Sequence, residues 1–166
     1  MSGNRRILGV VLLTLGLALA VSARAGADAA PPPSQLSSSG AVSPTAGELA
    51  IVHAMNAVRT SNGAPALRIG RALTLAARSH SVDMARRGYF EHGAFVRRLR
   101  SFGVRASYIG ENLAEGSQPL SAAAIVQMWI ASPPHRQNLL DRAFRRVGVG
   151  VAGGSTRLVT ADFAGR

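Results

Sequence analysis

Two short runs near the C-terminus constrain the fold of this chain more than any other feature. In residues 147–151 valine alternates with glycine, and in residues 159–163 apolar residues alternate with polar ones. A period of two is typical of a strand with one buried face, and the intervening Gly153-Gly154-Ser155 is typical of a hairpin turn. We therefore predict an antiparallel hairpin here, with residues 108–114 as a third strand.

The residues before the hairpin show helical spacing. Helices are predicted over residues 45–62, 71–87 and 121–131, and over a short segment after Ser132. The first opens with a capping box, Thr45 followed by Glu48. Ser132 can cap the last, with Pro133 at its first position, where a missing N–H costs nothing. Helices first and a hairpin last indicate an α+β domain with helices packed on a sheet.

Two histidines from turn-rich segments and a carboxylate from a predicted strand form the candidate site. His92 ends Tyr89-Phe90-Glu91-His92, Glu111 lies in Gly110-Glu111-Asn112-Leu113, and His135 lies in the segment Ser132-Pro-Pro-His-Arg-Gln-Asn138. Imidazole nitrogens and a carboxylate are what a zinc site or an acid–base site requires. The other two of the four histidines are interpreted as structural, because His80 falls on an apolar helix stripe and His53 has no motif around it.

The order of these segments resembles the CAP superfamily of SCP/PR-1-like secreted domains, in its short bacterial form. The resemblance runs from about Glu48 to Phe163 and also includes Asn56-Ala-Val-Arg59, residues 77–84 and Trp129-Ile-Ala-Ser-Pro-Pro-His135. It implies an α–β–α sandwich, a small antiparallel sheet with helices on both faces and a cleft across one side. In the first helix we expect Asn56 and Arg59 to make structural hydrogen bonds.

In the resembled family the cleft carries two histidines and two acidic residues. His92, Glu111 and His135 match three of these positions, and the second acid falls at or near Ser132. Serine cannot replace a carboxylate as a base or as a negative ligand, which argues against acid–base catalysis. The resemblance implies a Zn²⁺ site at His92 and His135. Glu111 would be either the third ligand or the acceptor of a hydrogen bond from a ligating histidine. His135 is expected to be neutral near pH 7, because a helix N-terminus disfavours its protonation.

The N-terminal part predicts export. Residues 1–25 have a basic start, an apolar run from Ile7 to Val21 and a closing Ala23-Arg24-Ala25, the order of a cleaved signal peptide. The apolar run is shorter than the roughly 20 residues of a spanning helix, so the mature form should lack a membrane span. Residues 26–44 are rich in Ala, Pro and Ser and predict a disordered spacer, followed by the folded domain over residues 45–166.

Charge narrows the choice of partners. The chain carries a net charge of +11 and no cysteine, so neither a disulfide nor a lipoprotein anchor is available. An exported basic protein favours anionic partners such as lipid headgroups or acidic cell-envelope polymers. Nucleic acid is not expected, because the arginine clusters lack interleaved aromatic residues. A solvated cationic surface without a dedicated ligand accounts for the same charge.

We expect a monomeric, secreted binding module. No Gly-x-Ser-x-Gly elbow, cysteine nucleophile or His-Glu-x-x-His helix is present. Two alternatives stay open at this stage. One is a metal-dependent hydrolase that uses His92, His135 and Glu111, and the other is a lipid- or sterol-binding protein in which the histidines are incidental.

Overall fold

The computed structural model describes residues 42–165. The predicted signal peptide and most of the predicted spacer lie outside this part of the chain. Within it, the elements in chain order are α1 (Ala46–Ser61), β1 (Arg68–Ile69), α2 (Arg71–Arg87), α3 (Phe95–Ser101), β2 (Ile109–Ser117), α4 (Ala122–Ala131), α5 (Pro133–Leu140), β3 (Arg146–Ala152) and β4 (Thr156–Ala164). Among these residues, no helix is both long and apolar enough to cross a bilayer.

The strands form one sheet in the order β1-β3-β4-β2. The predicted hairpin is confirmed as β3 and β4, which are antiparallel, and β4 pairs antiparallel with β2 on its other side. β2 therefore lies at one edge of the sheet. The predicted third strand is confirmed and continues to Ser117.

The expectation of a wholly antiparallel sheet is wrong in one respect. β1 pairs with β3 in parallel, so the sheet is mixed. β1 has only two residues, which is too short to show an alternating pattern in the sequence. The seven-residue helix α3 was also not predicted. Its buried residue is Leu99, and one buried position does not make a helical pattern that can be recognised in the sequence.

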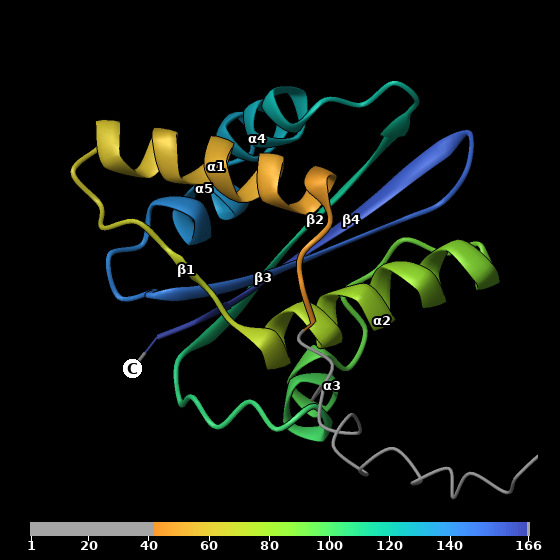
Figure 1. The fold of residues 1–166 in the computed structure, drawn as a ribbon, viewed down its shortest axis with the longest axis horizontal. Helices are drawn as coiled ribbons and strands as arrows, with labels where there is room; N and C mark the ends of the chain where they lie inside the picture. The colour runs from red at the N-terminus through yellow and green to blue at the C-terminus, as the bar shows by residue number, and fades with distance from the viewer. Residues whose placement is uncertain (1–41, 166) are drawn as a thin grey trace, which may run out of the picture. The chain divides into compact units, whose positions relative to one another are not determined.

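The helices cover both faces of the sheet. α1, α4 and α5 lie on one side, and α2 and α3 lie on the other (Figure 1). The first layer encloses the larger apolar cluster, in which Trp129, Phe144 and Phe163 are fully buried. The indole N–H of Trp129 donates to the carbonyl of Leu113 at 2.8 Å, so the polar atom of this buried side chain is hydrogen-bonded.

α2 packs directly on the backbone of β3. The valines of β3 face the α1–α4 layer, so the alternating glycines face α2. A Cβ atom on Gly148 would lie 2.1 Å from the Leu73 carbonyl carbon, and one on Gly150 would lie 2.3 Å from that of Ala77. The valine–glycine alternation therefore gives β3 two different faces. The valine side chains pack into the apolar core, and the glycines let the backbone of α2 lie directly against the strand.

α1 is fixed at both ends. The capping box is confirmed, since Glu48 Oε2 accepts from the Thr45 backbone N–H at 2.7 Å and Thr45 Oγ1 accepts from the Glu48 N–H. Asn56 exchanges two hydrogen bonds with the backbone of Leu67. Arg59 is fully buried. Its guanidinium donates to four carbonyls, those of Pro65, Leu139, Asp141 and Phe144, so the expected structural role of this pair is confirmed.

Candidate functional site

The candidate site is built around Glu111, a buried carboxylate on the edge strand β2. Glu111 Oε1 lies 2.8 Å from His92 Nδ1, and Oε2 accepts a hydrogen bond from the Arg98 guanidinium. His92 belongs to the loop after α2, whereas Arg98 belongs to α3. A strand at the sheet edge can meet loops from both helix layers, which is why segments distant in sequence converge here.

His92 presents one ring nitrogen to solvent. Its Nδ1 is engaged by Glu111, and half of its side chain (51%) is exposed, so Nε2 is left for a ligand. Burial of the ring and the positive charge of Arg98 lower the pKa of His92. The ring is therefore neutral near pH 7, and a carboxylate behind a histidine orients it as in many metal sites.

His135 approaches from the opposite helix layer. It lies in the first turn of α5, and its ring centroid is 6.5 Å from that of His92. Burial and the neighbouring His92 lower the pKa of His135, so this ring is also neutral near pH 7. The carbonyl of His135 accepts from the Asn112 side chain at 2.9 Å, which ties α5 to β2.

A second amide completes the connection between α5 and β2. Asn138 donates to the carbonyl of Glu111 and to the side chain of Asn112. Asn112 is fully buried. The asparagines in the two sequence motifs therefore hold His135 in place relative to Glu111, a role that the motifs alone do not reveal.

Sequence reasoning missed two residues of the site, Arg98 and Asp162. Asp162 on β4 stands directly opposite Glu111 in the antiparallel register. It is fully buried, and Arg98 lies 3.6 Å from its Oδ1. The available signal was an acidic residue at a polar position of the alternating run 159–163. Its importance becomes visible only when the strand register pairs it with Glu111.

The two carboxyl groups share a single neighbouring cation. Burial raises the pKa of Glu111 to about 7, against the opposing effect of Arg98. Burial and the charge of Glu111 raise the pKa of Asp162 well above its ordinary range. Two adjacent buried carboxylates repel each other when both are ionised, so the pair holds a proton near pH 7. We assign that proton to Asp162, the more deeply buried of the two.

Ser132 lies between α4 and α5 and is the N-cap residue of α5. Its side chain accepts no capping hydrogen bond, so the predicted capping role of the hydroxyl is wrong. The second acidic group of this site is supplied by Asp162, from a different strand. Within residues 42–165, no group of three or more His, Cys, Asp or Glu side chains is arranged to hold a metal ion.

A family model described as the cysteine-rich secretory protein family, CAP, matches residues 52–163. The chain belongs to this family. The matched range contains His92, Glu111, His135 and Asp162. Although the family is described as cysteine-rich, this CAP chain contains no cysteine, so it is held together without disulfide bonds.

Relatives of known sequence and structure agree with this assignment. The uncharacterized protein YkwD of Bacillus subtilis is 34% identical over 125 residues, which are 72% of this chain and 47% of YkwD. An extracellular protein containing a SCP domain from Bacillus anthracis is 30% identical with a TM-score of 0.66, over 72% of this chain and 40% of that one. This chain therefore spans less than half the length of either relative.

The fold extends to more distant proteins. An outer surface protein of Borrelia burgdorferi has a TM-score of 0.64 and 17% sequence identity, over 70% of this chain and 90% of that one. At such identity the likeness concerns the fold alone. The expected α–β–α arrangement of the CAP family is thus confirmed for residues 42–165, with the mixed sheet as its one departure from our expectation.

Proposed function

We propose that this CAP-family protein acts outside the cell as a binding module, and that His92 and His135 bind one divalent transition metal ion. Zinc is commonly bound by neutral imidazoles in proteins, so we take it as the metal. An extracellular location is supported by the predicted signal peptide and by the relative from Bacillus anthracis, which is described as extracellular. The hydrogen bond between Glu111 and His92 Nδ1 is the observation that carries the metal proposal.

That hydrogen bond directs the free Nε2 of His92 outward. A histidine that binds metal through one nitrogen usually donates the other N–H to a carboxylate or a carbonyl, and the partner fixes the ring and raises its basicity. Glu111 fills that position. Its second oxygen is taken by Arg98, so we place Glu111 behind the ligand and not on the metal.

The rings lie slightly farther apart than a shared ion requires. Two imidazoles on one tetrahedral zinc ion, with Zn–N bonds of about 2.0–2.1 Å, have ring centres roughly 5–5.5 Å apart. The observed centroid distance is 6.5 Å, so the rings must approach each other by about 1 Å to share the ion. His92 lies in a loop and is half exposed, so a small rotation would bring its ring closer.

Calorimetric titration with zinc tests the proposal. We expect one bound ion for the wild type and no binding for His92→Ala or His135→Ala. His53→Ala is the matched control, because His53 is an exposed histidine on α1, and this variant should bind as the wild type does. Equal heats for all four proteins would contradict the proposal.

The affinity should depend on pH. Protons compete with the metal for imidazole nitrogens, and the pKa values of His92 and His135 lie below the ordinary value of 6.5. Binding should therefore persist through pH 6.5 and weaken only below it. Zinc titrations in buffers of decreasing pH measure this, and a loss of affinity centred above pH 6.5 would argue against these two ligands.

A further inference from the structure

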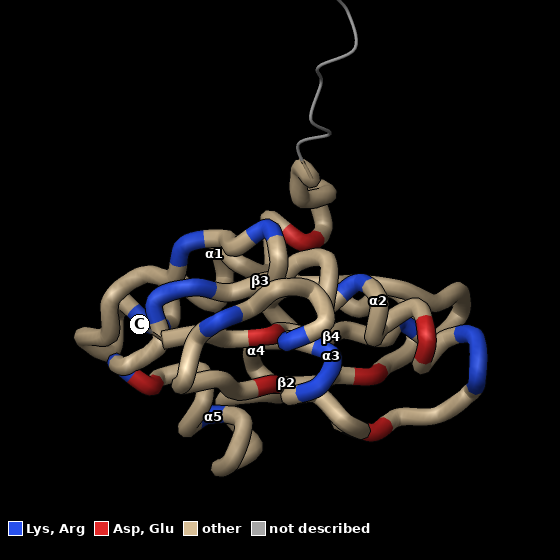
Figure 2. The backbone as a smooth tube through the Cα atoms, turned by 90° about the horizontal axis from the view of Figure 1, so that it is seen from below, with Lys and Arg blue, Asp and Glu red and all other residues tan. Residues whose placement is uncertain are grey.

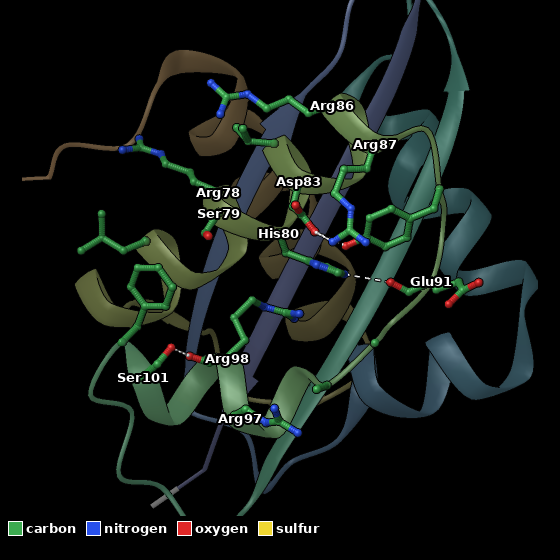
Figure 3. Close-up of a pocket in the computed structure, with 16 residues that line it drawn as sticks. Arg78, Ser79, His80, Asp83, Arg86, Arg87, Glu91, Arg97, Arg98 and Ser101 are labelled. Carbon is green, nitrogen blue, oxygen red and sulfur yellow. Dashed lines mark hydrogen bonds and ion pairs between the residues drawn. The ribbon is translucent and has the colours of Figure 1, made fainter.

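A groove with a volume of about 1150 Å³ lies beside the candidate site, between α2 and α3. Figure 3 shows it with Arg78, Arg86 and Arg87 on the α2 side and Arg97 and Arg98 on the α3 side. Figure 2 shows basic residues, in blue, along α2 and α3. His92, Glu111 and His135 do not line this groove. It is therefore a second site, and it shares only Arg98 with the first.

Two of the five arginines form ion pairs with buried glutamates. Arg78 pairs with the buried Glu48 at 2.6 Å, and Arg98 pairs with Glu111. These contacts hold the two guanidinium groups in place, and the glutamate carboxylates balance their positive charge. The groove therefore depends on its remaining three arginines, Arg86, Arg87 and Arg97, for attraction of an anion.

Those three arginines are exposed. Arg87 makes an exposed ion pair of 3.3 Å with Asp83, whose carboxylate also accepts a hydrogen bond from the Tyr89 hydroxyl. Within residues 42–165, no hydrogen bond or ion pair engages the side chain of Arg86 or of Arg97. These two side chains belong to opposite walls, so a ligand lying between α2 and α3 could contact both.

The groove also offers apolar surface. Leu75, Val82 and Phe102 contribute to its lining, and Val82 is 38% exposed although it is a large apolar residue. Sugar rings have apolar C–H faces that pack on such surfaces, while their acidic substituents project sideways. An acidic polysaccharide strand would therefore place its rings on these residues and its charged groups against the arginines of both walls.

We propose that the groove between α2 and α3 binds an acidic polysaccharide strand, with acidic groups held by Arg86 and Arg97 and sugar rings packed on Val82 and Phe102. A strand suits this site better than a flat membrane, because the arginines lie on the two walls of a groove. Arginine binds carboxylate and phosphate groups alike through its fork of N–H donors. Polysaccharide binding in the groove does not require a metal ion at His92 and His135.

The test uses polygalacturonate as a probe, with its fully methyl-esterified form as an uncharged control of the same backbone. We expect the wild type to bind the acidic form and not the ester. Arg86→Gln/Arg97→Gln should weaken binding about tenfold, which is the upper range for two exposed charge contacts. The matched control Arg68→Gln/Arg142→Gln removes the same charge elsewhere, from exposed arginines, and should change the affinity less than about twofold.

Further measurements distinguish polysaccharide binding from binding to a lipid surface and from attraction by net charge. Inorganic polyphosphate carries charge without sugar rings and should bind more weakly than polygalacturonate of equal charge. Binding to phosphatidylglycerol vesicles in place of the polymer would overturn the proposal in favour of a lipid surface. Equal losses in the two double variants would also overturn it, because they would indicate attraction by net charge alone. A chelator should leave polymer binding unchanged, so failure of the metal site is recognised separately.

Discussion

Glu111 on β2 and Asp162 on β4 stand directly opposite each other in the antiparallel register, and Arg98 contacts both. Directly opposed residues share one face of a sheet, so these two carboxyl groups are buried together under α3. Asp162 has no hydrogen-bond partner for either oxygen among the described residues, apart from what a shared proton with Glu111 would provide. The candidate site thus rests on a buried cluster of two acids and one arginine.

Replacement of Asp162 by Asn should remove a pH dependence of stability. A carboxyl group whose pKa is raised by folding binds more protons in the folded state than in the unfolded state. Its contribution to stability is therefore fully present below its unfolded pKa and is lost as pH rises through the folded pKa. Between about pH 5 and pH 8 the wild type should lose about 1 kcal/mol or more relative to Asp162→Asn.

Urea unfolding of both proteins at several pH values measures this difference. At low pH the two proteins should have similar stability, because Asn resembles the protonated acid in shape. A stability difference that stays constant from pH 5 to pH 8 would show that Asp162 is ionised throughout. Glu111→Gln is a useful companion, since it leaves Arg98 facing only Asp162.

His80 should lower the stability of the fold as pH decreases, opposite to the effect of Asp162. The ring is 4% exposed, and Nε2 lies 2.9 Å from the Glu91 carbonyl. Burial, together with Arg98, lowers the pKa of His80 to about 4. Because the unfolded chain takes up a proton near pH 6.5 and the folded chain does not, stability falls as pH decreases from 6.5 towards 4.

His80→Gln removes that effect while keeping a side-chain donor for the Glu91 carbonyl. Relative to this variant, the wild type should be about 2 kcal/mol less stable at about pH 4.5 than at about pH 7.5. Chemical denaturation at both pH values is the measurement. Parallel pH profiles for the two proteins would mean that His80 is protonated in the folded state.

Gly148→Ala should unfold the domain or distort it. The added Cβ would lie 2.1 Å from the backbone of α2 at Leu73 and Thr74, and backbone atoms cannot rotate away as a side chain can. We expect a loss of about 3 kcal/mol or more. Gly154→Ala is the control, because a Cβ there meets nothing within 4 Å; its thermal midpoint should match the wild type. A mild effect at Gly148 would contradict the close seating of α2 on β3.

Arg59→Ala should be among the most destabilising substitutions of a charged residue. It would leave four carbonyls short of a donor and would open a cavity under the connection that follows α5. Each buried acceptor left without a donor costs about 1–3 kcal/mol, so we expect a total loss of about 3 kcal/mol or more. Arg68→Ala, at an exposed arginine, should change stability by less than about 0.5 kcal/mol. Denaturant unfolding of both variants distinguishes them.

Local patterns in the sequence were enough to predict most elements of this fold. The capping box at Thr45, the helical spacing over residues 71–87 and the alternation in residues 147–151 act over a few neighbouring residues, and each is confirmed. Propensities, caps and turns depend on near neighbours in the chain, so they can be read without the tertiary structure. β1 and α3 were missed because both are too short to carry a period.

The tertiary structure decided what the candidate site contains. Sequence order alone indicated His92, Glu111 and His135, through motifs that resemble those of a known family. Asp162 entered the site through the register of β2 against β4, and Arg98 entered through the packing of α3 under the sheet edge. Contacts between residues far apart in the chain depend on how packed layers exclude water and fix distances, and no local pattern records them. The same is true of the groove, whose two walls meet only because α2 and α3 fold back on each other.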